Sequence, residues 1–335
     1  MRPSLLPRLV NGPFDDPALF IRFLFENRAI LFDLGDIHNL SNRDILKISH
    51  VFVTHAHMDH FIGFDRLLRI FLGRDKNLHV FGPLGIIKHV AGKLSGYQWN
   101  LVEQFTHSLS IEVTEIRNDM LKTCTFHCQN RFEPHQDQSE RPFSACILRE
   151  PGFAVHVAVL DHRIPCLALC IQEIFHVNIK KDALAALELI PGPWIQKFKQ
   201  ALYQNLPSDT PIEVASNGSS KHYAMGQLSQ KIATISPGQK IAYITDIILS
   251  PENINKIKIL APGCDQLYIE AAFLDQDRSI AQKKYHLTAR QAGHIAGMLS
   301  AKKVIPFHFS PRYMDKAALL EAETIQAFHE SRTTQ

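Results

Sequence analysis

The sequence predicts an α+β fold in which two β-sheets pack face to face between outer helices, a four-layer αβ/βα sandwich. Three observations support this prediction. Of the 335 residues, 45% are hydrophobic and 21% are charged, which is typical of an ordered globular chain. Short apolar runs alternate with stretches of helical periodicity. The runs fall into two series, one in each half of the chain, so we expect each half to contribute a sheet and its helices.

The elements of each series follow from run length and periodicity. In the first series, runs of strand length lie at residues 19–25, 29–34, 51–54 and 78–81, and a helical pattern lies at 61–72. In the second, strand-like runs lie at 145–148, 153–160, 166–171, 241–245, 266–269 and 304–307, and helical patterns lie at 288–299 and 316–328. Since no internal repeat or low-complexity tract divides the chain, we expect a single domain over residues 1–335.

One segment interrupts the regular pattern of the second series. Residues 173–205 contain the run Pro191-Gly192-Pro193, which breaks regular structure, and lysines follow it at positions 197 and 199. We expect this segment to form a helical arm inserted into the sandwich.

Composition and charge narrow the functional classes. The formal net charge of +3 is too small to require or to exclude a nucleic-acid partner. No run reaches about 18 uncharged apolar residues, so we expect no membrane-spanning helix. The N-terminal residues lack the apolar core of a signal peptide, and none of the six cysteines stands in a Cys-x-x-Cys pair. We therefore expect a cytoplasmic protein with reduced thiols.

The densest chemical signal is the run His55-Ala56-His57-Met58-Asp59-His60, which places three imidazoles and one carboxylate within six positions. His55 and His57 follow the apolar run 51–53, so if that run continues as a strand, both rings leave one face. Asp59 and His60 come where a helical pattern begins and would project towards a neighbouring second metal. Zinc favours imidazole nitrogen and carboxylate oxygen. The run therefore predicts a binuclear metal site whose remaining ligands lie downstream.

Further ligands should also stand where apolar strands end, because a rigid scaffold must hold them. Three residues meet this condition: His162 after the run 157–160, Asp246 after 241–245 and His308 after 304–307. A single histidine or aspartate at a strand end is more often a turn or capping residue. Together with the histidine run, however, the three complete the ligand count for two metals.

These residues, in this order, resemble the metallo-β-lactamase superfamily of binuclear hydrolases. The run His286-Leu287-Thr288-Ala289 is similar to the His-Ser-Thr-Ala-type element of ribonuclease Z, the endonuclease that trims the 3′ trailer from tRNA precursors. The run from His308 to Tyr313 is similar to that family's His-x-Ser-x-Arg-Tyr element. The arm, with Gly192 and Pro193, lies between His162 and Asp246, as the flexible arm does in ribonuclease Z. The resemblance extends from about residue 33 to residue 313.

The resemblance implies a role for each candidate residue. One zinc ion would be held by His55, His57 and His162, and a second by Asp59, His60 and His308, with Asp246 bridging them. Manganese and iron are alternatives at such ligands. Asp59 would orient the attacking hydroxide, and His286 would donate a proton to the departing 3′ oxygen. Substrate contacts would come from Ser310, Arg312, Tyr313, Gly192, Pro193, Lys197 and Lys199.

Simpler roles remain open for some of these residues. Arg312 and Tyr313 are also explained as stabilising the chain after the last ligand, and His286 as a local partner of a helix cap. Trp194, Lys197 and Lys199 are equally explained as a solvated amphipathic face.

The implied function is that of a zinc-dependent endoribonuclease acting on tRNA precursors, and a homodimer is in keeping with it. The alternative enzyme is a binuclear phosphodiesterase or other ester hydrolase with a small substrate. A non-catalytic RNA-binding module is a third hypothesis, but such a chain would be expected to have lost ligands.

Three parts of the sequence depart from the ribonuclease Z pattern. Residues 9–15 replace a glycine-rich loop, Ile247 and Ile248 follow Asp246 where Thr and Arg are common, and Met58 replaces a small residue, usually glycine.

Overall fold

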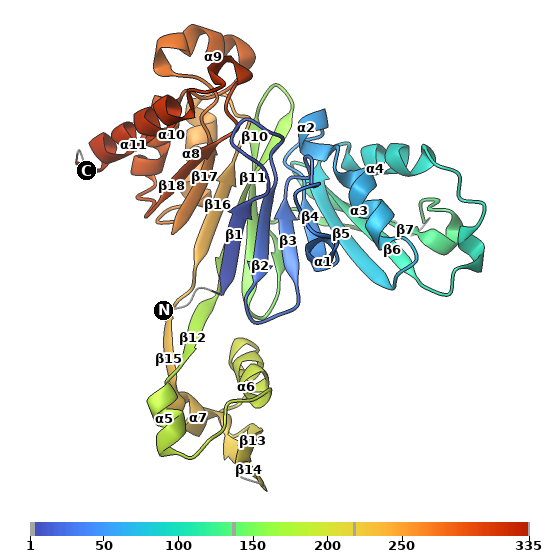
Figure 1. The fold of residues 1–335 in the computed structure, drawn as a ribbon, viewed down its shortest axis with the longest axis vertical. Helices are drawn as coiled ribbons and strands as arrows, with labels where there is room; N and C mark the ends of the chain where they lie inside the picture. Colours follow the sequence, from blue (N-terminus) through green and yellow to red (C-terminus); the bar gives the residue numbers. More distant parts are fainter. Residues whose placement is uncertain (1–3, 136–138, 217–218, 334–335) are drawn as a thin grey trace.

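Two β-sheets form the centre of the computed structural model, which describes residues 4–135, 139–216 and 219–333 (Figure 1). The first sheet has the strand order β1 (Leu5–Leu9), β2 (Leu19–Phe23), β3 (Ala29–Phe32), β4 (Ile48–Phe52), β5 (Lys76–Pro83), β6 (Leu109–Ile116), β7 (Met120–His127), β8 (Ser139–Pro142). The second has the order β18 (Val304–Phe307), β17 (Gln266–Glu270), β16 (Lys240–Ile244), β11 (Pro165–Glu173), β10 (Phe153–Asp161), β9 (Cys146–Arg149).

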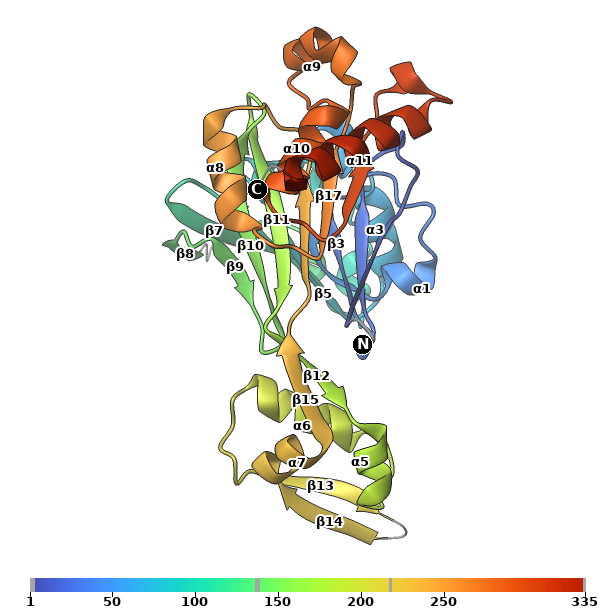
Figure 2. The ribbon, with the colours of Figure 1, turned by 90° about the vertical axis from the view of Figure 1, so that its left-hand side faces the viewer.

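Helices cover the outer face of each sheet. The first sheet carries α1 (Asn42–Ile45), α3 (Phe64–Phe71) and α4 (Ile86–Ser95), and the second carries α8 (Pro251–Leu260), α10 (Ala289–Met298) and α11 (Ala317–Thr333). Figure 2 shows α10 and α11 crossing in front of the second sheet. Shorter elements are α2 (Met58–Phe61), α9 (Arg278–Lys284), η1 (Val102–Gln104), η2 (Cys128–Asn130), η3 (Asp275–Asp277) and η4 (Pro311–Tyr313).

Three separate apolar cores hold these layers together. Phe32, Phe52 and Tyr243 belong to the core between the two sheets. A second core packs the first sheet against its helices, and a third packs the second sheet against α8, α10 and α11. Three cores between four layers confirm the predicted sandwich.

Parallel pairing brings several strand ends to one edge of each sheet. Strands β3, β4, β5 and β6 are parallel neighbours, and so are β16, β17 and β18. Because parallel strands end at the same edge, the residues that follow them gather there. This edge carries the candidate site.

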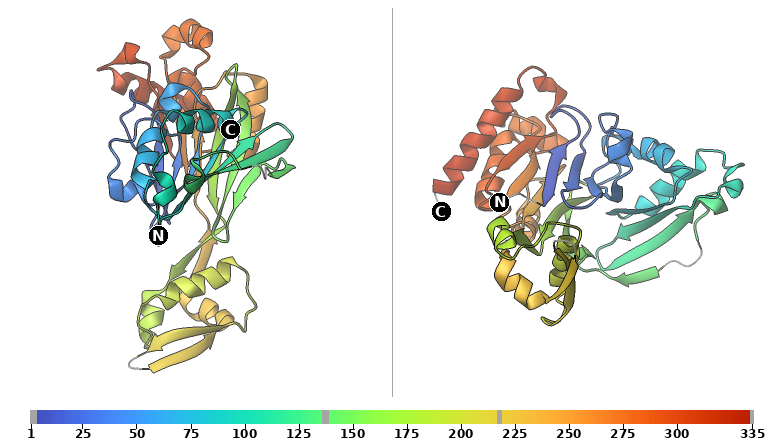
Figure 3. Two further views of the ribbon diagram at one scale, coloured as in Figure 1. Left: turned by 90° about the vertical axis from the view of Figure 1, so that its right-hand side faces the viewer. Right: turned by 60° about the horizontal axis from the view of Figure 1, so that its bottom comes forward.

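The arm leaves the sandwich from the opposite edge and is longer than the segment 173–205 expected from the sequence. It comprises β12 (Phe175–Ile179), α5 (Lys181–Ala186), α6 (Trp194–Tyr203), β13 (Pro211–Ser216), β14 (Ser219–Ala224), α7 (Met225–Ile232) and β15 (Ala233–Pro237). Strands β12 and β15 pair antiparallel as a stalk, and the rest hangs from them (Figure 1, Figure 3). The arm has a core of its own, which includes Val177, Trp194, Phe198 and Leu228.

Among the described residues, every helix is too short or too polar to cross a lipid bilayer.

Candidate metal centre

The histidine run lies in the loop between β4 and α2. Strand β4 ends at Phe52, before His55 and His57, so the two rings converge through the loop and not through a shared strand face. His55 Nε2 lies 2.8 Å from His57 Nδ1. His57 immediately precedes α2, which begins at Met58 and carries Asp59 and His60 in its single turn. The helix expected after the run is therefore present, although it is short and is followed by α3.

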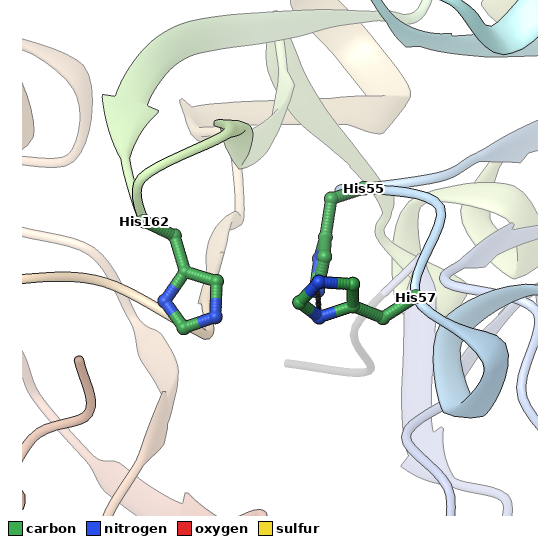
Figure 4. A group of neighbouring side chains, drawn as sticks. All are labelled: His55, His57 and His162. Carbon is green, nitrogen blue, oxygen red and sulfur yellow. Dashed lines mark hydrogen bonds between the residues drawn. The ribbon is translucent and has the colours of Figure 1, made fainter. Parts of the chain in front are cut away.

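His162 completes a group of three imidazoles with His55 and His57. It follows β10, and Figure 4 shows its ring facing the other two across an open space. One ligand atom from each of the three residues lies within 4.8 Å of the others. His162 Nδ1 donates to the carbonyl oxygen of Tyr285 at 2.9 Å, which leaves Nε2 as the lone-pair nitrogen. The three rings can therefore hold one cation.

Asp59, His60 and His308 form the second group. Asp59 Oδ2 lies 3.4 Å from His60 Nε2 and 3.3 Å from His308 Nε2. His308 follows β18, so this group joins a helix beside the first sheet to a strand of the second.

Asp246 lies between the two groups. Its Oδ2 is 2.7 Å from His60 Nε2 and 3.9 Å from His55 Nε2, and its Oδ1 is 3.4 Å from His308 Nδ1. Burial raises the pKa of Asp246, but the charges of His308 and His60 outweigh burial and hold it well below its usual value. The structure thus brings together all seven ligand candidates.

Two of the strand-end residues hold an unusual backbone conformation. Asp246 has φ 50° and His308 has φ 57°, in the left-handed region, and so does Asp33 with φ 58°. Non-glycine residues rarely adopt this region, and aspartate and histidine are among those that tolerate it best. The turn ends each strand abruptly, and such strained positions gather at functional sites.

Asp33 was not among the candidates chosen from the sequence, yet it fixes the orientation of the His60 ring in the cluster. It follows β3, is fully buried, and accepts hydrogen bonds from the Thr54 backbone N–H (2.7 Å), the Tyr243 hydroxyl (2.9 Å) and His60 Nδ1 (2.8 Å). Gly63 packs closely against the chain that follows Asp33. A Cβ atom at position 63 would lie 2.1 Å from the carbonyl oxygen of Gly35, so this packing requires a glycine. A carboxylate that fixes the ring of a metal-binding histidine is a recurrent arrangement.

The donor set fits a divalent cation. Because His60 Nδ1 donates to Asp33, His60 Nε2 is left as an acceptor that faces the Asp246 carboxylate, and two acceptors repel unless a cation or proton lies between them. His60 Nε2 and His308 Nδ1 are buried without a hydrogen-bond partner among the described residues. Burial lowers the pKa of His60, but the charges of Asp33 and Asp246 raise it well above its usual value. The carboxylates of Asp33 and Asp246 therefore favour a positive charge at this position, either from a proton on His60 or from a cation.

His286 stands beside the candidate ligands. It belongs to neither group of three described above, but it forms a further possible metal-binding group with Asp246, Glu270 and His308. Its Nδ1 donates to Glu270 Oε2 at 2.8 Å and to Asp246 Oδ1 at 3.0 Å. Burial lowers the pKa of His286, but the charges of Glu270 and Asp246 raise it to about 10. It does not cap the helix α10, because Thr288 does so in a capping box with Gln291.

Glu270 is the second residue that the sequence analysis missed. It is the last residue of β17, is fully buried, and also accepts from the backbone N–H of Ile247 at 2.8 Å. The signal that selected Asp246 and His308, a polar residue where an apolar run ends, applies equally to Asp33 and Glu270.

A cavity of about 570 Å³ opens beside the cluster, and its wall includes His57, Asp59, His162, Asp246, His286 and His308. Ser310 also lines it.

Arg312 is exposed, with Nε 3.6 Å from Asp277 Oδ2. Tyr313 is buried, and its hydroxyl donates to Asp277 and accepts from the backbone N–H of Leu274. These contacts of Tyr313 hold the chain that follows His308.

The arm candidates lie far from this cavity. Gly192 and Pro193 stand at the start of α6, where Trp194 Nε1 donates to the Ile190 carbonyl oxygen at 2.8 Å. Lys197 is exposed. Lys199 is buried at the base of the arm, with Nζ 4.5 Å from the centre of the Phe25 ring. The two lysines therefore occupy different environments.

Comparison with known proteins identifies relatives over most of the chain. Ribonuclease Z of Deinococcus radiodurans is 27% identical over 289 residues, which cover 85% of this chain and 83% of that protein. Ribonuclease Z of Bacillus subtilis is 28% identical over 323 residues, covering 94% and 89%. The chain is a relative of ribonuclease Z. No family model matches the sequence.

Solved structures show the same fold. Human tRNase Z, short form, superposes with a TM-score of 0.51 at 17% identity and covers 93% of each chain. The metallo-β-lactamase fold protein YhfI from Bacillus subtilis superposes with a TM-score of 0.52 at 14% identity, covering 96% of this chain and 92% of that one. The fold is therefore the metallo-β-lactamase fold, and the donor set makes the site that of a metal cofactor.

The three departures from the ribonuclease Z pattern leave the cluster intact. In the N-terminal loop, the Pro13 carbonyl accepts from the backbone N–H of Phe309 at 2.7 Å, which fixes the chain next to His308. Ile247 is buried, and Met58 is 76% exposed beside the cavity.

Proposed function

We propose that this protein is a zinc-dependent endoribonuclease that removes the 3′ trailer from tRNA precursors. The observation that carries the proposal is the convergence of two ligand groups, Asp246 and His286 on one cavity, in a chain whose relatives are named ribonuclease Z. The substrate and the reaction come from that relationship, and the cavity supplies groups suited to phosphodiester hydrolysis.

In the proposed ligand set, His55, His57 and His162 would hold one zinc ion, and Asp59, His60 and His308 would hold a second. Asp246 would serve both, which its position in groups with both His55 and His308 supports. Manganese or iron would suit the same nitrogen and oxygen donors. When bound, such ions lower the pKa of water towards about 7 and polarise a phosphate oxygen.

Side chains of the protein would orient the attacking water and supply the proton for the leaving oxygen. Asp59 is 42% exposed to the cavity and would accept a hydrogen bond from the attacking water, which orients its lone pair towards phosphorus. His286 donates through Nδ1 to Glu270 and Asp246, and its raised pKa of about 10 keeps a second proton on Nε2, which it would deliver to the departing 3′ oxygen. Ser310, on the cavity wall, would donate to a phosphate oxygen.

The arm, in this proposal, grips the folded body of the tRNA through Gly192, Pro193 and the exposed Lys197, while Arg312 contacts the phosphate backbone near the cavity. The support is the arm's position at the edge opposite the site, where it can reach RNA far from the cut. A homodimer and a cytoplasmic location are also part of the proposal. All six cysteines are free, as expected in a reducing compartment.

The test compares two substrates and two proteins. Wild type and an arm-deleted form should be assayed on a trailer-bearing tRNA precursor and on bis(p-nitrophenyl) phosphate, with zinc content measured in parallel. The deletion should replace residues 176–236 by a short glycine-serine turn, because Phe175 and Pro237 are paired at the base of the stalk. We expect the deletion to abolish precursor cleavage selectively. If wild type hydrolyses only the small diester, the alternative of a small-substrate phosphodiesterase holds instead.

Light scattering after size exclusion tests the dimer, and a single-subunit mass would contradict it.

A further inference from the structure

One wall of the catalytic cavity carries cations that neither the ligand set nor the arm includes. Arg163, Lys283 and Lys284 line the same cavity as the proposed ligands. All three are exposed, and none forms an ion pair with another side chain in the described part of the chain. Helix α9 carries both lysines. By contrast, Arg278 at the start of this helix forms an ion pair with Asp275 at 2.8 Å. Three unpaired cations facing one cavity favour an anionic ligand there.

The guanidinium of Arg163 is held in place. It lies over the Tyr285 ring, 4.9 Å from the ring centre, and its Nη1 donates to the Tyr285 hydroxyl. An arginine fixed in this way loses less side-chain entropy on binding than a free one, and its planar fork suits a phosphate.

The same wall is tied to the chemistry by the backbone. Arg163 follows the ligand His162, and Tyr285 precedes His286. The Tyr285 carbonyl accepts from His162 Nδ1 at 2.9 Å, so the two segments are joined across the cavity wall. Both Arg163 and Tyr285 have φ 63°, in the left-handed backbone region that non-glycine residues rarely adopt.

The lining residues that follow His308, which are Phe309, Ser310 and Pro311, carry no charge. The cations of the lining belong instead to the two segments that contain His162 and His286.

We propose that Arg163, Lys283 and Lys284 form a subsite for the backbone phosphate one nucleotide upstream of the cut. This inference rests on the proposed function, in which His286 protonates the leaving 3′ oxygen. The nucleotide that carries this oxygen must lie at the His286 wall, and its own 5′ phosphate is the next anion along the strand. The subsite distinguishes an RNA chain from a small phosphodiester, which has no second phosphate.

The experiment removes charge first from the RNA and then, in separate variants, from the protein. A tRNA precursor is prepared with an uncharged methylphosphonate one linkage upstream of the cut, and a second with the same group one linkage downstream. For wild type, kcat/KM should fall about tenfold or more on the upstream substrate, the loss expected for charge-assisted hydrogen bonds to one phosphate. The downstream substitution should cost much less.

The variant Lys283→Gln/Lys284→Gln, and the triple variant that adds Arg163→Gln, should cleave the normal precursor more slowly and lose most of the sensitivity to the upstream methylphosphonate. Zinc content checks that His162 remains in place, and the double variant avoids the residue next to it. Lys258→Gln, an exposed lysine on α8, is the matched control and should behave as wild type.

Equal sensitivity to the upstream methylphosphonate in wild type and in both variants would overturn the subsite. Failure of wild type to cleave any precursor would overturn the proposed function and the subsite with it.

Discussion

The metal cluster and the arm are assembled from the chain in different ways. The cluster draws its residues from both sheets and buries them, so that His55, His60 and Asp246 are each at most 1% exposed. The arm is one continuous segment with its own small core, joined to the sandwich by two strands. Chemistry at the cluster depends on positions fixed by the whole fold, whereas any role of the arm depends on its exposed side chains. Single substitutions should therefore have large effects at the cluster and small ones in the arm.

Asp246→Ala should produce the largest effect. Asp246 contacts residues of both proposed metal groups, so its loss should remove zinc and reduce precursor cleavage by at least about 10³-fold. Metal analysis of the purified variant and single-turnover cleavage measure the two results. Normal zinc content with normal activity would show that Asp246 is not a ligand.

His286→Ala should separate proton transfer from metal binding. We expect zinc content to stay at the wild-type level while turnover falls by about 10²- to 10⁴-fold, because only the proposed proton donor is lost. Loss of zinc in this variant would mean that His286 has a structural role in the cluster.

The candidate ligands were predictable because each follows an apolar run in the sequence. This rule selected His162, Asp246 and His308, although β10, which precedes His162, pairs antiparallel with both of its neighbours. The rule failed to separate ligands from supporting residues, since Asp33 and Glu270 satisfy it equally. Sequence spacing could not distinguish these two carboxylates from ligands either. Asp33 and Glu270 come from different strands, and each forms its hydrogen bond with a histidine of the cluster only in the folded chain.

The arm was predictable only in part, for a physical reason. Its first half contains prolines that interrupt the pattern, but its second half returns to the sandwich through strand and helix signals like those of the body. The burial of Lys199 could not be predicted at all, because it depends on Phe25, a residue more than 170 positions away. The strand predicted at residues 51–54 also ends earlier than expected, since the apolar run gives no sign that the pairing of β4 stops at Phe52.

Glu270→Gln should have an intermediate effect. Glu270 touches no substrate in the proposed mechanism and acts by holding His286, so it is a positioning residue. We expect kcat to fall by about 10- to 100-fold, the range for such supporting partners, with little change in KM. Restoration of the charge in Glu270→Asp should recover part of the rate. A change confined to KM would contradict this role.

Lys197 and Lys199 form a matched pair within the arm. Lys197→Ala should leave the free energy of unfolding within about 0.5 kcal/mol of wild type and should raise KM for the precursor about threefold to tenfold. Lys199→Ala should lower the free energy of unfolding by about 1–2 kcal/mol, because it removes buried packing and the contact with Phe25. Urea unfolding and steady-state kinetics distinguish the two. An unchanged KM in Lys197→Ala would argue against this residue as part of an RNA clamp.

The smallest effect should appear in the pH dependence of stability. Burial lowers the pKa of Lys199, and the charge of Glu173 only partly opposes it. The unfolded chain then binds more protons at this position than the folded chain between the lowered pKa and about 10.4, so stability rises with pH across that window. Lys199→Met lacks this titration. The difference in unfolding free energy, wild type minus Lys199→Met, should therefore increase between pH 8 and pH 10. A difference that is constant or falls with pH would place the Lys199 ammonium in water, and the base of the arm would then be open where the structure has it packed against the sandwich.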